Sequence, residues 1–95
     1  MAATIRFTPQ AVANLETIRS WIAADDERAA DRVLARIRQA TEMLGQFPKL
    51  GHQGSVTGTR ELKVTGLPYL LVYVLHRGDI DILTVLYARR CYPPA

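Results

Sequence analysis

Cationic and aromatic side chains gather in the second half of this sequence. Guanidinium and ammonium groups neutralise phosphate and tyrosine rings stack on bases, so such a mixture suits the binding of nucleic acid. Arginine and tyrosine also anchor protein–protein interfaces. The members of this group are Arg60, Lys63, Tyr73, Tyr87, Arg89, Arg90 and Tyr92. If the strands that carry them pair as neighbours, we expect several of these residues to share one face or edge of the sheet.

The charge of the chain is unevenly distributed along its length. The net charge is +3. Residues 1–47 carry six arginines and six acids, whereas residues 48–95 carry six bases and three acids. A polyanion or an acidic protein segment is therefore expected to be attracted to the second half.

The other reactive residue types are isolated from one another. The sequence has no glycine-rich phosphate loop, no cysteine–histidine set with metal-ligand spacing and no Gly-x-Ser-x-Gly turn. His52 and His76 stand alone, Asp79 and Asp81 flank the start of a predicted strand, and Cys91 has no second cysteine to pair with. We interpret these side chains as solvated or structural, and we expect neither a metal nor a cofactor.

The length and composition indicate a single domain that spans residues 1–95. A lone cysteine is typical of a reducing compartment. The chain has no apolar run long enough for a membrane span and no signal-peptide core at its amino terminus. We therefore expect a cytoplasmic protein that makes no contact with a membrane.

The first half reads as a short strand followed by two helices. Alternation predicts a strand over residues 4–7, and Thr8 is a capping residue followed by proline at the first helical position. The first helix is expected to end near Ala24. The Asp25–Asp26 pair caps a second helix, which Gly45 is expected to end. So short a connection requires the two helices to be antiparallel.

The second half reads as a glycine-rich loop followed by three strands. The loop covers residues 49–58, and strands are expected over residues 59–65, 69–75 and 80–87, with a turn at residues 76–79. The order β-α-α-β-β-β predicts an α+β fold. It has an N-terminal strand, an antiparallel two-helix hairpin and a three-stranded antiparallel meander, with both helices packed on one face of the sheet.

Short motifs spread over the chain resemble those of the RelE/ParE toxin superfamily. They are Ile-x-Phe-Thr-Pro-x-Ala with Leu-x-x-Ile over residues 5–18, and Leu-x-x-Phe-Pro-x-x-Gly over residues 44–51. Three further matching segments cover residues 59–64, 68–73 and 82–89. The resemblance extends from Ile5 to Arg90 and rests on the order and spacing of these pieces.

The resemblance implies that the chain is the toxin half of a bacterial type II toxin–antitoxin module, a kind of module that stabilises plasmids. It implies a protein partner, an antitoxin (ParD-like or of another family) whose carboxy-terminal segment wraps the toxin and silences it. It also implies one of two targets. RelE-like members cut messenger RNA on the ribosome, whereas ParE-like members inhibit DNA gyrase.

The residues that the resemblance marks as a nuclease site match only in part. RelE-like nucleases have two lysines at the positions of Glu61 and Lys63, an arginine at the position of Leu70, an arginine near Arg89 and a late tyrosine or histidine, for which Tyr92 is a candidate. Cleavage by 2′-hydroxyl attack needs a proton acceptor and cations that stabilise the charged phosphate. An apolar leucine cannot replace such a cation.

We therefore favour a ParE-like gyrase inhibitor that is not an enzyme. A RelE-like ribosome-dependent endoribonuclease is the alternative, and a degenerate relative that only binds an antitoxin is a further one. If the chain is a nuclease, its catalytic candidates are Lys63, Arg89, Tyr87, Tyr92 and Glu61. The expected target-binding residues are Arg60, Lys63, Tyr73, Arg89, Arg90 and Tyr92.

The antitoxin is expected to bind the first helix and an edge of the sheet. Apolar side chains would form the contact, and the basic second half would attract acidic residues of a segment that folds as it binds. Trp21 is otherwise interpreted as a residue at the edge of the core. The expected antitoxin-binding residues are Leu15, Ile18, Trp21, Ile22 and Arg77.

Overall fold

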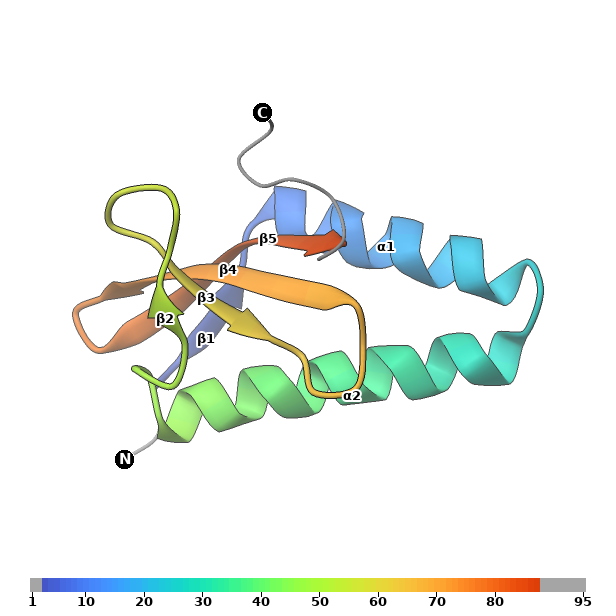
Figure 1. The fold of residues 1–95 in the computed structure, drawn as a ribbon, viewed down its shortest axis with the longest axis horizontal. Coiled ribbons are helices and arrows are strands. Elements are labelled where there is room, and N and C mark those ends of the chain that lie inside the picture. Colours follow the sequence, from blue (N-terminus) through green and yellow to red (C-terminus); the bar gives the residue numbers. More distant parts are fainter. Residues whose placement is uncertain (1–2, 88–95) are drawn as a thin grey trace.

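The fold combines a helical hairpin with one sheet (Figure 1). The computed structural model describes residues 3–87. In chain order the elements are β1 (Ile5–Phe7), α1 (Pro9–Ala23), α2 (Glu27–Gln46), β2 (His52–Gln53), β3 (Arg60–Lys63), β4 (Tyr69–His76) and β5 (Asp79–Tyr87). The predicted α+β class is confirmed, as is the order of strand, helical hairpin and antiparallel meander.

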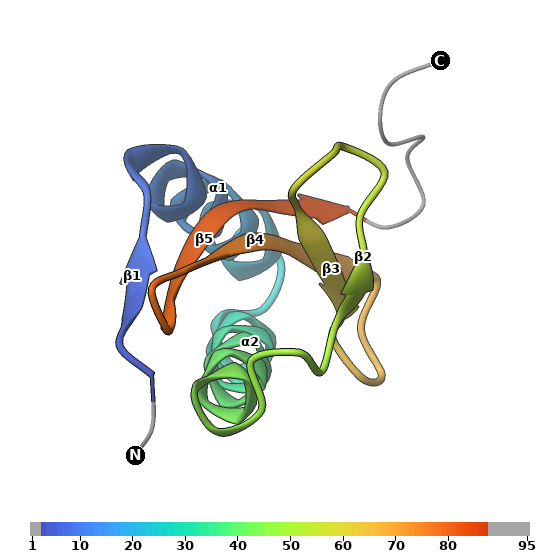
Figure 2. The same ribbon diagram turned by 90° about the vertical axis from the view of Figure 1, so that its left-hand side faces the viewer.

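The sheet has five strands in the order β1-β5-β4-β3-β2. Strands β3, β4 and β5 form the expected antiparallel meander, but β1 pairs in parallel with β5. The two-residue strand β2 pairs with β3 at the opposite edge and lies in the segment expected to be a loop. Figure 2 shows the sheet as an arch, with β1 on one side, β2 and β3 on the other, and α2 beneath it.

The helices begin where the sequence predicts. The Thr8 hydroxyl oxygen accepts a hydrogen bond from the Ala11 N–H at 3.1 Å, and proline follows Thr8 at the first helical position. The Asp26 carboxylate accepts hydrogen bonds from the N–H groups of Arg28 and Ala29. Both caps satisfy backbone donors that the first turn of a helix leaves unpaired.

The predicted end of α2 at Gly45 is wrong. The helix continues to Gln46, and Gly45 is buried inside it. A Cβ at this position would lie 3.3 Å from Ile5 Cδ1 and 3.6 Å from the Ala3 carbonyl oxygen. The glycine is therefore used for a close approach between α2 and the segment around β1, not for a left-handed cap.

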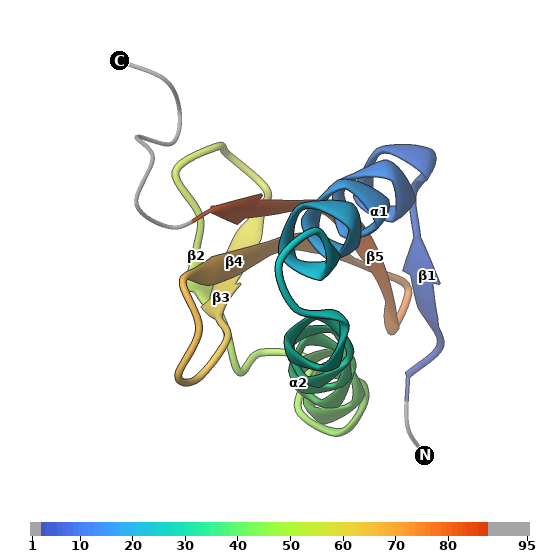
Figure 3. The ribbon, with the colours of Figure 1, turned by 90° about the vertical axis from the view of Figure 1, so that its right-hand side faces the viewer.

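Both helices lie on the same face of the sheet (Figures 1 and 3). Ile37 and Leu44 of α2 are buried together with Leu71 and Ile80 of the two central strands. Trp21 is 71% exposed, so its interpretation as a core-edge residue is wrong. None of the helices in the described part of the chain is long and apolar enough to cross a membrane.

Candidate functional site

The two faces of the sheet separate the predicted basic and aromatic cluster. Arg60 lies opposite Tyr73, and Tyr87 lies opposite Tyr69, on the face that packs against the helices. Side chains alternate between the two faces along β3, and Lys63 is three residues from Arg60, so its side chain is on the other face. Three of the four described members, Arg60, Tyr73 and Tyr87, therefore share one face as expected, whereas Lys63 does not. The other three members, Arg89, Arg90 and Tyr92, lie outside the described residues.

Tyr73 is a core residue and not part of a binding surface. Its side chain is 0% exposed. Its hydroxyl donates a hydrogen bond to the Pro48 carbonyl oxygen at 2.9 Å and accepts one from the Gly51 N–H at 3.0 Å. Because the ring is enclosed by the core, its expected role in target binding is corrected to a structural one.

Arg60 is also used within the molecule. One terminal nitrogen of its guanidinium donates hydrogen bonds to the carbonyl oxygens of Lys49 and Gly51. The Nε atom is buried and has no hydrogen-bond partner. Together with Tyr73, Arg60 fixes the connection between α2 and β2, which is a different role from the expected contact with a target.

The sheet face opposite the helices, here called the outer face, carries the positions that the nuclease resemblance marks. Its described residues on β3, β4 and β5 include Glu61, Lys63, Leu70, Val72 and Leu86. Lys63 is exposed and lies directly opposite Leu70, which in turn lies opposite Leu86. The structure therefore brings positions 61, 63 and 70 together on one face, and the cation of that group is Lys63.

Glu61 points its carboxylate at the backbone of the β2–β3 connection. The residue is 6% exposed, and its Oε2 atom accepts a hydrogen bond from the Ser55 N–H at 3.0 Å. A carboxylate held in this way is withdrawn from solvent and orders the loop. Glu61 is therefore poorly placed to act as the base of a nuclease.

Tyr87 packs edge-to-face against Tyr69. The ring centroids are 5.9 Å apart and the rings are inclined at 64°. Burial, and to a lesser extent the neighbouring Tyr87 hydroxyl, raises the pKa of Tyr69 above its usual value of 10.0. Tyr87 belongs to the helix-facing side of β5, so it does not share a face with Lys63 as a pair of catalytic groups would.

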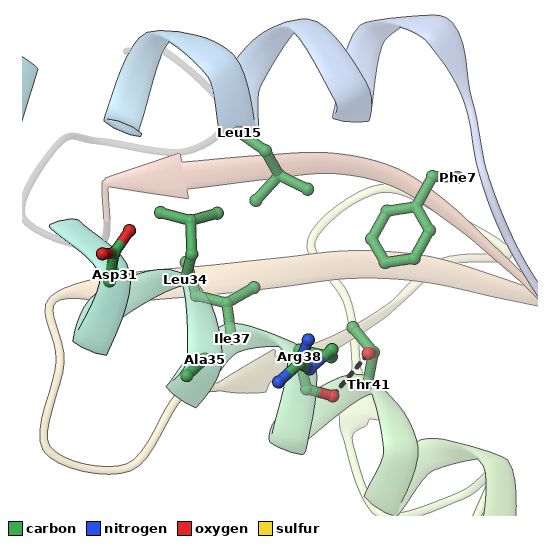
Figure 4. Close-up of a pocket in the computed structure, with 8 residues that line it drawn as sticks. All are labelled: Phe7, Leu15, Asp31, Leu34, Ala35, Ile37, Arg38 and Thr41. Carbon is green, nitrogen blue, oxygen red and sulfur yellow. Dashed lines mark hydrogen bonds between the residues drawn. The ribbon is translucent and has the colours of Figure 1, made fainter. Parts of the chain in front are cut away.

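A second candidate surface is an apolar groove of about 450 Å³ between the helices and β1. Figure 4 shows Phe7, Leu15, Leu34 and Ile37 turned towards the same space. Charged side chains stand at its margin, where Arg19 forms an ion pair with Asp31 (2.7 Å) and Arg38 also lines the groove. Such a groove is suited to apolar side chains of a partner.

The predicted antitoxin-binding residues do not form one surface. Leu15 lines the groove and, like Ile18, packs against the core, and Ile22 is half-buried. Trp21 projects into solvent from α1. Arg77 lies in the β4–β5 turn, at the opposite end of the molecule from the α1–α2 connection (Figure 1).

One polar residue that the sequence pattern did not single out, Asn14 of α1, lies at the junction between α1 and β5. Its side-chain oxygen accepts hydrogen bonds from the Thr84 hydroxyl at 2.6 Å and the Val85 N–H at 3.1 Å. The available signal was an asparagine beside Leu15 on the helix face that carries Ala11. The described residues contain no group of three or more His, Cys, Asp or Glu side chains that could hold a metal ion.

The strand, helical hairpin and antiparallel meander have the order that the sequence resemblance to the RelE/ParE toxin superfamily predicts. Comparison with known protein families identifies the family within this superfamily. The model of the family described as the ParE toxin of the type II toxin–antitoxin system parDE matches residues 5–92. The chain therefore belongs to the ParE toxin family.

Two curated relatives are similar over nearly their whole length. A Sinorhizobium fredii protein named "Putative toxin Y4kP" is 40% identical over 94% of this chain and 92% of its own. A Caulobacter vibrioides protein named Toxin RelE2 is 32% identical over 93% of this chain and 98% of its own. The two names together represent a toxin class and not one target.

Two solved structures share the fold. A chain from the chromosomal ParDE toxin–antitoxin system of P. aeruginosa has a TM-score of 0.83, 20% identity and coverage of 93% of this chain and 98% of its own. The YoeB dimer from Staphylococcus aureus gives a TM-score of 0.59, 17% identity and coverage of 92% and 98%. At these identities the likeness bears on the fold alone.

Proposed function

We propose that this toxin inhibits DNA gyrase and is neutralised by a cognate antitoxin. The observation that carries the proposal is the composition of the outer face. Leu70 lies beside Lys63 where the superfamily's nucleases have an arginine, and Leu86 continues the apolar surface on the next strand. Loss of one charge-stabilising group typically costs about 10²–10³ in rate. A toxin that binds a protein target does not need such groups.

A RelE-like endoribonuclease is the second candidate. The exposed position of Lys63 on the outer face favours it, as does the similarity to a relative named RelE2. The orientation of Glu61 and Tyr87 weighs against it, because neither side chain faces Lys63 across the outer face as an exposed acid or base. A relative that binds an antitoxin and poisons nothing is the third candidate.

The deciding experiment is induction of the toxin in growing bacteria without its antitoxin, with DNA integrity and translation followed separately. Gyrase-dependent DNA breaks, an SOS response and filamentation with intact messenger RNA are expected. Rapid translation arrest with messenger RNA cut at codons would instead establish the nuclease. Unimpaired growth at a verified level of folded toxin would support the third candidate.

The basic residues provide a sharper test of the same proposal. Replacing Arg89 and Arg90 together by Ala is expected to abolish toxicity, and Lys63→Ala is expected to weaken it. Arg32→Ala, which removes an exposed cation from α2, is the matched control and is expected to remain toxic. Full toxicity of the double variant would show that the active face has been placed wrongly.

For the antitoxin, we propose that an apolar segment docks along α1, with contacts in the groove at Leu15 and at the exposed Trp21. Leu15→Glu and Trp21→Ala are each expected to weaken the toxin–antitoxin complex at least about tenfold. Each substitution removes an apolar side chain that the antitoxin segment would bury in the complex. Val56→Ser changes an exposed apolar residue of the β2–β3 connection and serves as the control. Unchanged affinity of both α1 variants in calorimetry would place the antitoxin elsewhere.

A further inference from the structure

Strand β5 contains a β-bulge in its middle. Val72 lies opposite Thr84, but the next residue of β4, Tyr73, lies opposite Ile82. Leu83 is therefore an extra residue with no partner on β4. A single extra residue reverses the alternation of side chains along the bulged strand.

The bulge decides which side chains the end of β5 presents on each face. Before the bulge Ile80 and Ile82 face the helices, and after it Val85 faces them. Strict alternation from Ile82 would instead have buried Leu86 and turned Val85 outward. Leu86 reaches the outer face, opposite Leu70, because of the extra residue at position 83.

In the described part of the chain, no other strand covers the edge of β5 at this bulge. β1 ends at Phe7, which is the partner of Ile82, so within residues 3–87 the following part of β5 has no strand neighbour on that side. Exposed backbone groups on such an edge allow slippage of register and pairing with foreign strands.

Beyond the end of β1, side chains of Thr8 and of α1 form hydrogen bonds with this edge of β5. The Thr8 hydroxyl donates a hydrogen bond to the Leu83 carbonyl oxygen at 2.7 Å. The Asn14 side-chain oxygen then accepts from both the Thr84 hydroxyl and the Val85 N–H. The bulged residue is thus bonded to the N-cap residue of α1, and the two residues after it are bonded to α1 itself.

The helical conformation of α1 does not by itself favour an asparagine at position 14. It has a lower helix propensity than alanine, and its amide competes with the helical backbone for hydrogen bonds. It is half-buried beside Leu15, which belongs to the apolar packing. A residue that departs from the local pattern in this way indicates a tertiary role.

We propose that Asn14 is a positioning residue that holds the bulged end of β5 in the register that turns Leu86 onto the outer face. It acts through the Thr84 hydroxyl and the Val85 N–H, and it touches no target itself. The functional part of this inference rests on the proposed function, in which the outer face contributes to target inhibition.

The test compares Asn14→Leu, which cannot accept a hydrogen bond, with Asn14→Asp, which keeps an acceptor oxygen. Ile37→Val, a small core deletion on α2, controls for a general loss of stability. The readouts are amide hydrogen exchange at Val85 in the purified toxin and the amount of toxin that arrests growth. We expect Asn14→Leu to lose at least about tenfold more protection at Val85 than Ile37→Val, and to need at least about tenfold more toxin.

Asn14→Asp is expected to retain most of both properties. Unchanged protection at Val85 in Asn14→Leu would overturn the proposal. The proposal would also be overturned if Asn14→Leu lost this protection but remained as potent as the Ile37→Val control. If Asn14→Leu fails to fold, Thr84→Val can be used instead, because it removes one of the two donors to Asn14. We expect it to lose protection at Val85 and potency in the same direction but by a smaller factor. Growth arrest without gyrase involvement would refute the proposed target alone, because potency is read here from growth.

Discussion

At the scale of single residues, polar aromatic side chains serve the interior of this protein. Tyr73 is enclosed by the core, yet its hydroxyl is paired on both sides, with the Pro48 carbonyl oxygen and the Gly51 N–H. Buried polar groups need such partners, because an unpaired one costs about 1–3 kcal/mol. The presence of Tyr73 among basic residues in the sequence therefore did not indicate that it belongs to a binding surface.

Tyr73→Phe is expected to lower the free energy of unfolding by about 1–3 kcal/mol, because the Gly51 N–H and the Pro48 carbonyl lose their partner. Urea unfolding followed by circular dichroism measures this change. The potency of the folded variant should equal that of the wild type. A loss of potency without a loss of stability would return Tyr73 to the target-binding set.

Tyr69 predicts a dependence of stability on alkaline pH. Its pKa is raised in the folded protein, so the folded state holds the phenol proton more tightly than the unfolded state does. This contribution is fully present below about pH 10, the unfolded pKa, and is lost as the pH rises through the raised folded pKa. Urea unfolding between pH 8 and about 11 should show a decline that is smaller in Tyr69→Phe, and an equal decline would contradict the assignment.

At the scale of elements, the β4–β5 hairpin turns through two residues. His76 pairs with Asp79, and Arg77 and Gly78 between them both have positive φ, at 52° and 83°. Positive φ at both central positions is the requirement of a tight hairpin turn of type I′, in which Asn-Gly is preferred. Arginine at the first position is therefore strained, since its Cβ disfavours this conformation.

Arg77→Asn is expected to raise the free energy of unfolding by about 0.5–1 kcal/mol, because asparagine tolerates positive φ better than arginine. Thermal unfolding measures the shift, and Arg77→Ala, which removes the charge without relieving the backbone, should not show it. A lower melting temperature for Arg77→Asn would mean that the arginine side chain makes stabilising contacts.

At the scale of the whole molecule, the core joins the helical hairpin to the two central strands. Leu44 is 0% exposed and belongs to the same buried cluster as Leu71 and Ile80. Close packing leaves a cavity when such a side chain is shortened, since the surroundings relax only in part. The stability of the hairpin therefore depends on the sheet, and that of the sheet on the hairpin.

Leu44→Ala is expected to cost about 2–5 kcal/mol of unfolding free energy. Leu50→Ala is the matched control, because Leu50 is 48% exposed and should change stability by less than about 1 kcal/mol. Both values come from chemical unfolding of the purified toxin. Similar losses for the two variants would contradict the placement of Leu44 in the shared core.

The local features of this protein follow from residues that are close together in the chain. The capping residues Thr8 and Asp26, the central apolar strand and a turn within residues 76–79 depend on neighbours in the chain, so they could be predicted. That the turn has only two residues, Arg77 and Gly78, came from the strand pairing. The meander also follows from short connections. The resemblance over residues 5–90 added the toxin class, which the family comparison confirmed.

Features that join residues far apart in the chain could be read only from the folded structure. The parallel pairing of β1 with β5, the close approach at Gly45 and the bulge held by Asn14 each join segments separated by dozens of residues. The same holds for the site, because cross-strand register assigned Tyr73 to the core and Lys63 to the outer face. A shift of one residue exchanges the two faces of a strand, and composition carries no information about that register.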